Sequence, residues 1–577
     1  MKIQTNVMSL NSQRALAGNA ANLSRSLERL SSGMRINSAK DDAAGLAITS
    51  RLGAQLRGMN VARRNASDGI SMLQTAEGAL ASAAQQVQRI RDLAVQATNA
   101  TNSATDRAAL AAEAQQLMAE IDRIGTTADF NGQLIFAQNA SSIGGDPNRR
   151  AVVDGLRLGW LEEAENLILQ NYGIKADGAD MQIDITADTD GAGGVAAFVA
   201  AAVGGQPGGR GTNLRLSIDM ADFTPPNLPS GGSAPMYNDR IIAHEMVHAV
   251  MARATNWQSL TSTSMWFTEG AAEFIHGADE RVQADIAAAA GGSADAKIAT
   301  VVNEIATWQL QSADYSAGYI GVRYLHDKLM AAGFSGGIKD FMVYLNGASA
   351  PTMDQAMTHF FGGGYTQASF LAEIQADSGN GLSNGVMFVK NKMNLANTDT
   401  GAIGGADVGG GPVRTAAEVL TNRDSGYSTN PLRSFRTTWQ NLGTGVTATR
   451  TASLQVGANA GQTNDVQLGA LGVTALGLGD VDLEGNAKIS IVHLDEALTY
   501  LNSQRAMVGA QMSRLENTIS NLATSVEAGS ASQSRVLDTD YATETATLTR
   551  ARILQQAGTA ILAQANSQQS RVLQLLR

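Results

Sequence analysis

The first part of the chain alternates apolar and polar positions in the way that packed helices do. From Asn6 to about Ile124 the pattern is almost wholly helical. Apolar residues spaced alternately four and three positions apart keep one face of a helix against a partner helix. A polar break at 39–42 is followed by further helical pattern. Near the start, apolar or small residues recur in alternating steps of four and three, at Leu16, Ala20, Leu23, Leu27, Leu30 and Met34.

The end of the chain carries a matching pattern. Heptad spacing runs from Leu494 to Val526 and is broken only by Arg505. We predict that the two ends pack together in one all-α, coiled-coil rod. Two separate bundles are the alternative, because heptads specify packing and not the partner. A last amphipathic segment has apolar residues at Leu554, Ile561, Val572 and Leu575.

A small hairpin and a different middle region interrupt the helices. Phe130–Phe136 contains an Asn-Gly turn between apolar residues, which predicts a β-hairpin. The middle region, about 141–396, holds five of the six His residues. Residues 182–185 and 214–219 alternate like half-buried strands. We therefore expect an α+β domain inserted into the rod, where surface hairpin tips tolerate insertion.

These patterns divide the chain into four regions. They are an N-terminal helical region at 1–140, the inserted domain at 141–396, a Gly/Thr-rich segment at 397–450 and a C-terminal helical region at 451–577. The Gly/Thr-rich segment has little periodicity, and we interpret it as a linker with short strands.

The composition excludes several classes of site and partner. The 577 residues have a formal charge of −11, and this acidic balance argues against nucleic acid as a partner. Cysteine is absent, which excludes disulfides, thiolate zinc sites and a cysteine nucleophile. No apolar run approaches the ~20 residues of a membrane helix, so no membrane partner is expected. The first residues also lack the apolar stretch of a cleaved secretory signal.

The sharpest chemical signal is the sequence His-Glu-Met-Val-His. On a helix, His244 and His248 lie four positions apart and project from one face, where both can bind one metal ion. Glu245 lies next to that face and can reach a metal-bound water. The flanking residues are apolar, so the helix is expected to be buried, and buried polar groups need a partner. The alternative is a helix with two incidental histidines.

A catalytic zinc ion needs a third protein ligand and one open position. Glu269 lies 21 positions past His248 in a segment rich in large apolar residues, which leaves room for a second helix to return to the metal. Glu273 lies one turn further on, and we expect it to hold the other ring nitrogen of a ligating histidine. Each could instead be a solvent-facing helix carboxylate.

A mechanism follows from these residues. Zinc lowers the pKa of bound water to about 7 and polarises a scissile carbonyl, while Glu245 takes the water proton and passes it to the leaving amine. Tyr315 is the candidate donor to the developing oxyanion, with Tyr319 behind it. On the residues alone, tyrosine in the core is the favoured reading for both. The other histidines have no ligand spacing and are expected to be structural or exposed; they are His276, His326, His359 and His493.

Residues 1 to about 140 and about 451 to 577 resemble bacterial flagellin. The resemblance implies an extracellular filament subunit that is exported unfolded without a cleaved signal and polymerises with other flagellin subunits through its terminal helices. Arg89 and Glu113 match positions that some flagellins use to engage an innate immune receptor. The matching stretches are Ile3–Asn6, Leu27–Ile36, Lys40–Ile48, Arg64–Leu80, Asp129–Gly132, Leu454–Gln462 and Gln569–Arg577.

The middle region resembles a zincin-type metallopeptidase of the glutamate-ligand class, close to clostridial-type collagenases. The resemblance implies His244, His248 and Glu269 as ligands of one catalytic Zn²⁺ and Glu245 as the base. Tyr315 lies in a Tyr-x-x-Gly arrangement like that of the transition-state tyrosine of related peptidases. Flagellins with such an insert are called flagellinolysins, and the chain is similar to them.

The sequence therefore predicts a flagellar filament subunit that displays a zinc endopeptidase acting on proteins or peptides. A purely structural flagellin with an inactive or surface-binding insert is the main alternative, and a soluble secreted protease with helical arms is another. A structural Ca²⁺ site is conceivable among the aspartates near 177–190, although no loop there has sharp ligand spacing.

Overall fold

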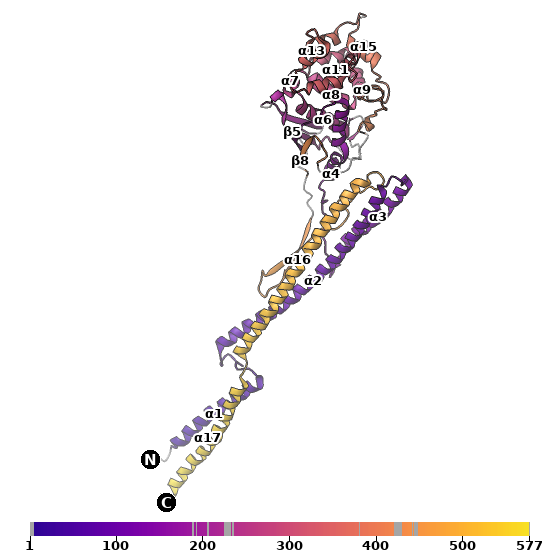
Figure 1. Ribbon diagram of the computed structural model, residues 1–577. Helices are drawn as coiled ribbons and strands as arrows, with labels where there is room; N and C mark the ends of the chain where they lie inside the picture. The colour runs from indigo at the N-terminus through magenta and orange to yellow at the C-terminus, as the bar shows by residue number, and fades with distance from the viewer. Residues whose placement is uncertain are drawn as a thin grey trace.

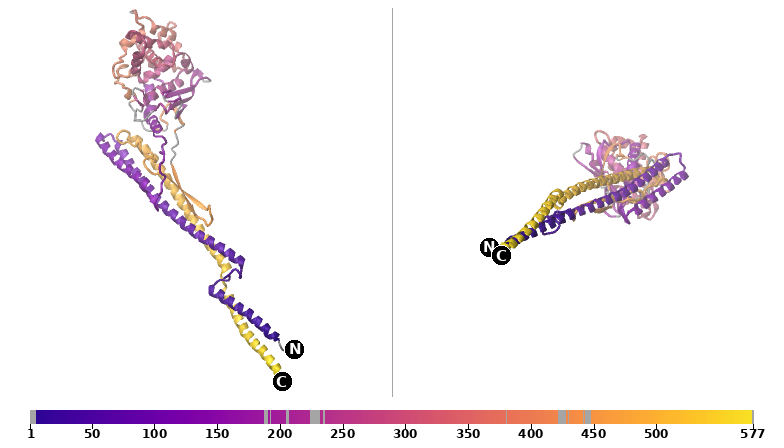
Figure 2. Two further views of the ribbon diagram at one scale, coloured as in Figure 1. Left: turned by 180° about the vertical axis from the view of Figure 1, so that it is seen from behind. Right: turned by 90° about the horizontal axis from the view of Figure 1, so that it is seen from below.

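Helices from both ends of the chain form one long rod. The structure, a computed structural model, describes residues 5–575 apart from 187–189, 192, 205–206, 224–231, 234–235, 380, 421–427, 429, 441 and 443–447. The first and last helices lie side by side at one end, and a globular domain lies at the other (Figures 1 and 2). The rod helices are α1 (Val7–Ser32), α2 (Ala43–Ala97), α3 (Ala104–Thr127), α16 (Ala487–Leu537) and α17 (Tyr541–Leu575).

The predicted joint rod is therefore what the structure contains. Helix α16 packs along α2, and its heptad residues Leu494, Leu501 and Leu515 are buried in a core shared with α2. Arg505, which breaks the heptads, donates from Nε to Glu77 Oε1 of α2 over 2.8 Å. Because a cation at a seam position meets a carboxylate of the partner helix, the coil continues past it.

The outer pair, α1 with α17, is covered less well. Leu27 of the predicted seam is 45% exposed, and Leu554 and Ile561 are more than half exposed. Two helices alone cannot enclose an apolar stripe on each, so part of both stripes faces outward. The side chains of Val572 and Leu575 lie outside the described residues.

Two hairpins lie on the rod. Strands β1 (Asp129–Phe130) and β2 (Gln133–Leu134) pair antiparallel as predicted. Their turn residues Asn131 and Gly132 both have positive φ, as a two-residue hairpin requires. Strands β9 (Thr449–Gln455) and β10 (Thr463–Gly469) form the second hairpin.

A mixed sheet with helices against it forms the inserted domain. Its strand order is β4-β5-β3-β8, in which β3 is parallel to β5 and β8, and β4 is antiparallel to β5 at the edge. The strands are β3 (Ala179–Thr186), β4 (Ala197–Ala202), β5 (Thr212–Asp219) and β8 (Phe435–Gln440), and a small separate pair is β6 (Gly232–Ser233) with β7 (Met236–Tyr237). The helices are α4 (Pro147–Gly155), α5 (Leu161–Tyr172), α6 (Asn238–Ala254), α7 (Trp257–Thr263), α8 (Met265–His276), α9 (Asp279–Ala288), α10 (Ala294–Asn303), α11 (Ser312–Ala331), α12 (Ile338–Leu345), α13 (Met353–Phe361), α14 (Gln367–Gln375) and α15 (Asn384–Lys392).

The predicted linker at 397–450 needs correction, because much of it belongs to the inserted domain. Ile403, Leu420 and Leu432 are buried in the core of that domain. The Tyr319 hydroxyl donates to the Gly401 carbonyl oxygen over 2.9 Å. Strand β8 completes the sheet beside β3. The segment has few apolar residues and no helical period, so its place is set by tertiary contacts that local pattern does not reveal.

The inserted domain is fixed to the rod through α4. His493 Nε2 of α16 lies 2.7 Å from Asp154 Oδ2 of α4, and both side chains are buried. Arg150 of α4 donates to the Gly477 carbonyl oxygen over 2.9 Å and to Glu496 Oε2 over 2.7 Å. The domain is thus seated on the start of α16 by polar contacts, of which that with Glu496 is half exposed.

Helices α8 and α11 cross closely inside the inserted domain. Gly270 of α8 and Gly318 of α11 face each other at the crossing, and a Cβ at Gly318 would lie 2.7 Å from the Trp266 carbonyl oxygen. Glycine at both positions lets the two backbones approach. The close crossing brings residues of α8 and α11 into one site.

We expect Gly318→Ala to destabilise the inserted domain by about 1–3 kcal/mol, because the added methyl group meets the α8 backbone. Thermal unfolding of the full chain, followed by circular dichroism, measures the effect. Gly292→Ala is the control, since a Cβ there meets no atom within 4 Å. Equal melting temperatures for the two variants would contradict the close crossing.

Candidate metal centre

Helix α6 carries the first part of the site. It begins after the extended residue Tyr237, has Asp239 in its first turn and ends before the extended residue Thr255. An acidic residue near the first turn suits the positive end of the helix dipole. The helix is buried over most of its length, between the sheet and α8. His244, Glu245 and His248 therefore project into the protein interior.

Ligand atoms from α6 and α8 converge on one point. His244 Nε2 and His248 Nε2 lie 3.2 Å apart, and Glu269 Oε2 lies 3.2 Å from the first and 3.1 Å from the second. In a tetrahedral site with bonds of about 2.0 Å, ligand atoms lie about 3.3 Å apart. The three side chains predicted as ligands therefore fit one small divalent cation.

Glu273 lies behind this cluster, next to His244. Its Oε1 is 3.4 Å from His244 Nδ1 and 3.3 Å from Arg281 Nη2, and its side chain is only 2% exposed. A carboxylate on Nδ1 leaves Nε2 of His244 directed to the ligand cluster. His248 Nδ1 is buried and has no hydrogen-bond partner among the described residues.

A second set of possible ligands shares His244 and adds Glu273 and His276. Arg281 already pairs with Glu273, and Arg240 Nη2 lies 3.3 Å from His276 Nδ1. Two guanidinium groups beside this set oppose a cation there. The set of His244, His248 and Glu269 is the better metal site.

The carboxylates of the site favour a positive charge between them. Burial alone would lower the pKa of His244, but hydrogen bonds with Glu269 and Glu273 outweigh it and raise this pKa to about 10. For Glu269, burial acts to raise the pKa, but His248 and His244 lower it well below its usual value. The site therefore holds a protonated histidine between carboxylates when no metal is bound.

Glu245 lies beside the ligands and is also buried. Its Oε2 accepts a hydrogen bond of 2.9 Å from the backbone N–H of Val199 on the edge strand β4. Burial raises the pKa of this carboxyl group, which makes it a better proton acceptor than an exposed glutamate. The edge strand β4 and the Glu245 carboxylate thus meet beside the candidate ligands.

The two tyrosines of α11 have different surroundings. The Tyr315 ring lies 6.4 Å from the His244 ring, and burial together with Glu269 raises the pKa of its hydroxyl to about 12. Tyr319 is fully buried and donates to Asp279 Oδ1 and the Gly401 carbonyl oxygen, so it does not stand behind Tyr315 as a donor. Its hydroxyl anchors the segment after α15 instead.

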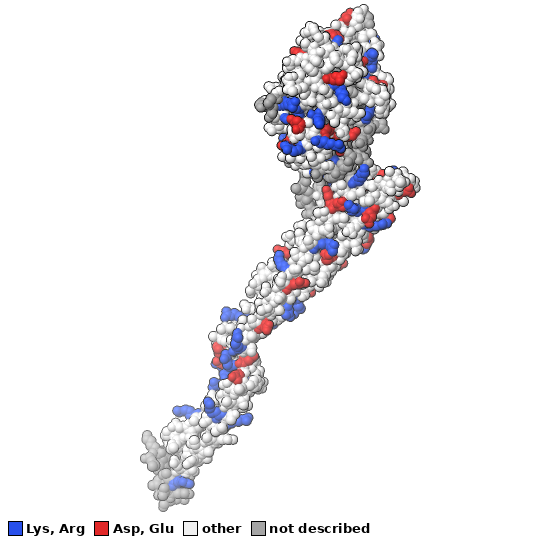
Figure 3. All heavy atoms as spheres, in the orientation of Figure 1, with Lys and Arg blue, Asp and Glu red and all other residues white. Residues whose placement is uncertain are grey.

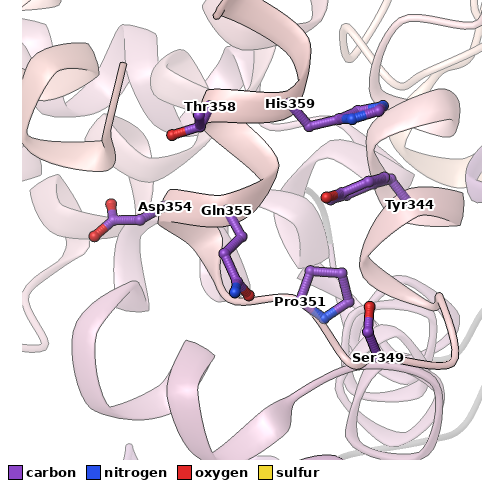
Figure 4. A pocket seen from close by; sticks show the side chains of 7 residues that line it. All are labelled: Tyr344, Ser349, Pro351, Asp354, Gln355, Thr358 and His359. Carbon is purple, nitrogen blue, oxygen red and sulfur yellow. The ribbon is translucent and has the colours of Figure 1, made fainter. Parts of the chain in front are cut away.

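Sequence reasoning missed several neighbours of the site. Arg281 contacts Glu273, His276 lies at the end of α8 with its ring 5.8 Å from that of His244, and the Trp257 ring lies 5.9 Å from that of His248. Arg281 and Trp257 have no spacing signal, because packing between helices brings them to the site, whereas His276 lies three positions after Glu273 on the same helix. Among the other histidines, His359 stacks on Tyr344 at 4.1 Å in a separate shallow pocket on α12 and α13 (Figure 4).

The two residues predicted to contact a receptor lie on the rod. Arg89 donates to Glu113 Oε1 over 2.9 and 2.7 Å on the exposed surface of α2 and α3. Asp177 and Asp180 form ion pairs with Arg253 and Arg436, and the described residues hold no further metal-ligand group near 177–190; residues 187–189 lie outside the description. No described helix is long and apolar enough to cross a membrane.

Known proteins are similar to this chain at its two ends and, in some cases, along its whole length. Residues 3–141 match the bacterial flagellin N-terminal helical region, and residues 491–576 match the bacterial flagellin C-terminal helical region. B-type flagellin of Pseudomonas aeruginosa is 31% identical over 584 aligned positions, covering 100% of both chains. Flagellin of Salmonella typhimurium is 28% identical, covering 100% of this chain and 99% of its own. Flagellin A of Vibrio cholerae is 40% identical over 198 positions, 32% of this chain and 52% of its own.

We expect uptake of a divalent cation such as Zn²⁺ at pH 8 to release at least one proton per ion. His244 has a raised pKa of about 10 without metal and must be neutral to ligate, so the ion displaces its proton. Calorimetry in buffers with different ionisation enthalpies measures the release. Glu273→Gln removes one source of the raised pKa and should reduce the release, and binding without proton release would contradict the described charge state.

Proposed function

The chain belongs to the bacterial flagellin family, and we propose that this subunit of the flagellar filament also carries a zinc-dependent endopeptidase in its inserted domain. The observation that carries the proposal is the convergence of His244, His248 and Glu269 on one point. Two imidazole nitrogens and one carboxylate oxygen are a donor set that suits Zn²⁺ with one position left open.

When bound, Zn²⁺ supplies a Lewis acid that activates water and polarises a carbonyl group. Glu245 acts as general base, since its buried carboxylate lies beside the ligands and can accept the water proton. The Val199 N–H orients that carboxylate over 2.9 Å. Glu245 then delivers the proton to the leaving amine.

Tyr315 is proposed as the donor to the developing oxyanion. Its pKa of about 12 keeps the hydroxyl protonated at neutral pH, as a donor must be. Its ring centre lies 6.4 Å from that of His244. Removing one oxyanion donor costs about 10²–10³ in rate in well-studied hydrolases.

The position of the insert supports display outside the filament core. The domain lies at the end of the rod opposite α1 and α17 (Figure 1). The half-exposed apolar residues of α1 and α17, such as Leu27 and Ile561, are available for burial by neighbouring subunits. Proteins and peptides in the medium are then the proposed substrates.

Two further features belong to the proposal and rest on the family alone. Export proceeds unfolded and without a cleaved signal peptide. Arg89 and Glu113, which pair with each other on the exposed rod surface, are the proposed contacts with an innate immune receptor. Along the visible face of the rod, charges of both signs are interspersed (Figure 3).

We expect Glu245→Gln to lower cleavage of an unfolded protein by at least about 10³-fold, because the amide cannot accept the water proton. Filament assembly should be unchanged, since Glu245 lies in the inserted domain, whose core is separate from that of the rod helices. Cleavage is measured by gel electrophoresis on purified filaments, and assembly by electron microscopy. Zinc-loaded wild-type filaments that cleave nothing would favour a purely structural insert.

Tyr315→Phe and Tyr319→Phe should separate catalysis from folding. We expect Tyr315→Phe to lower kcat about 10²-fold with little change in melting temperature. Tyr319→Phe leaves the buried Gly401 carbonyl without its donor, while Asp279 keeps the hydrogen bond from Arg323, so it should destabilise the domain by about 1–3 kcal/mol and keep kcat. The reverse pattern would assign the donor role to Tyr319.

A further inference from the structure

Arg281 of α9 contacts two functional residues that come from different helices. Its Nη2 lies 3.3 Å from Glu273 Oε1 of α8, and its guanidinium carbon lies 5.3 Å from the ring centre of Tyr315 of α11. Its side chain is 22% exposed. One cation therefore touches both the support of a metal ligand and the proposed oxyanion donor.

Glu273 needs this cation. Its side chain is 2% exposed, and a buried carboxylate without a counter-charge is strongly destabilised. Among the described residues, the cationic or histidine groups within 4 Å of it are His244, His276 and Arg281. When His244 is a neutral metal ligand, Arg281 is the permanent charge that remains beside Glu273.

The Tyr315 ring is held by the same guanidinium. Arg281 lies within the distance at which a cation is attracted to an aromatic face. Trp308 meets the same ring in an edge-to-face arrangement at 5.4 Å. Among the described residues the Tyr315 hydroxyl has no hydrogen-bond partner, so ring contacts set the direction of the side chain.

We propose that Arg281 is a positioning residue that holds Glu273 on His244 and the Tyr315 ring beside the site at once. The inference rests on the proposed function, because it treats His244 as a ligand and Tyr315 as the donor. Through Glu273 it acts on metal affinity, and through Tyr315 it acts on the chemical step. A single side chain thus couples the ligand set to the oxyanion donor.

Variants of the full chain test this. Zinc affinity is measured by competition with a chromophoric chelator, independently of cleavage, and kcat is measured on zinc-saturated protein. Arg281→Met should weaken zinc binding about 10–100-fold, the usual loss when a group supporting a ligand is removed. Arg281→Lys keeps the charge but cannot reach the carboxylate and the ring together, so zinc affinity should stay within threefold and kcat should fall about tenfold.

Lys328→Met is the matched control. Lys328 also pairs with a carboxylate, Glu373, at 2.7 Å, lies 5.1 Å from the Tyr365 ring, and is 25% exposed, yet it touches no site residue. Its loss should change zinc affinity and kcat less than twofold. Melting temperatures of all variants report folding, and Arg281→Lys serves where Arg281→Met does not fold.

A double variant isolates the route to the metal. With Glu273→Gln, no buried charge remains for Arg281 to balance, so adding Arg281→Met should cost no further zinc affinity. Additive losses would overturn the inference, as would unchanged zinc affinity in Arg281→Met or unchanged kcat in Arg281→Lys. A wild-type chain that binds no zinc would instead overturn the proposed function and the inference with it.

Discussion

One electrostatic constraint shapes the candidate site of the inserted domain: His244, His248 and Glu269 lie close together with their donor atoms 3.1–3.2 Å apart, and only His248 is fully buried. Lone pairs at that separation repel unless a proton or a cation lies between them. Hydrogen bonds with Glu269 and Glu273 outweigh burial and raise the pKa of His244 to about 10, so a proton on this ring relieves part of the repulsion. The packing around the site holds these three side chains in place. The close crossing of Gly270 and Gly318 and the ion pair of Glu273 with Arg281 are parts of that packing.

The rod is held by a different kind of interaction. Its core is a long apolar seam between α2 and α16, with Arg505 and Glu77 paired where the seam is polar. The two systems meet at α4, where Asp154 and His493 make a buried contact. Because each part has its own core, packing does not transmit a change at the candidate site to the seam, so the proposed metal binding is separable from filament assembly.

Sequence analysis predicted the parts of the molecule that are encoded by a local pattern of residues. Heptads gave the rod helices, the Asn-Gly turn gave the β1–β2 hairpin, and the His-Glu-Met-Val-His helix gave the residues that converge. It could not find Arg281 or the contacts of Tyr319 with Asp279 and Gly401, because tertiary packing brings these residues together. It also assigned 397–450 to a linker, since a Gly-rich segment with few apolar residues shows no period even when those residues, such as Ile403, are buried.

Residues 397–450 also affect the stage of folding at which the candidate site forms. The end of α8, which carries Glu269 and Glu273, is tied to residues far along the chain: the Ile403 N–H donates to the Phe274 carbonyl oxygen over 3.0 Å, and the Thr400 hydroxyl donates to that of His276 over 2.9 Å. Strand β8 then closes the sheet on which α6 packs. The ligand helices therefore reach their final packing only after residues to about 440 have joined the domain. A chain that crosses a channel unfolded, as the proposed export requires, would assemble its metal site only after the whole insert has emerged.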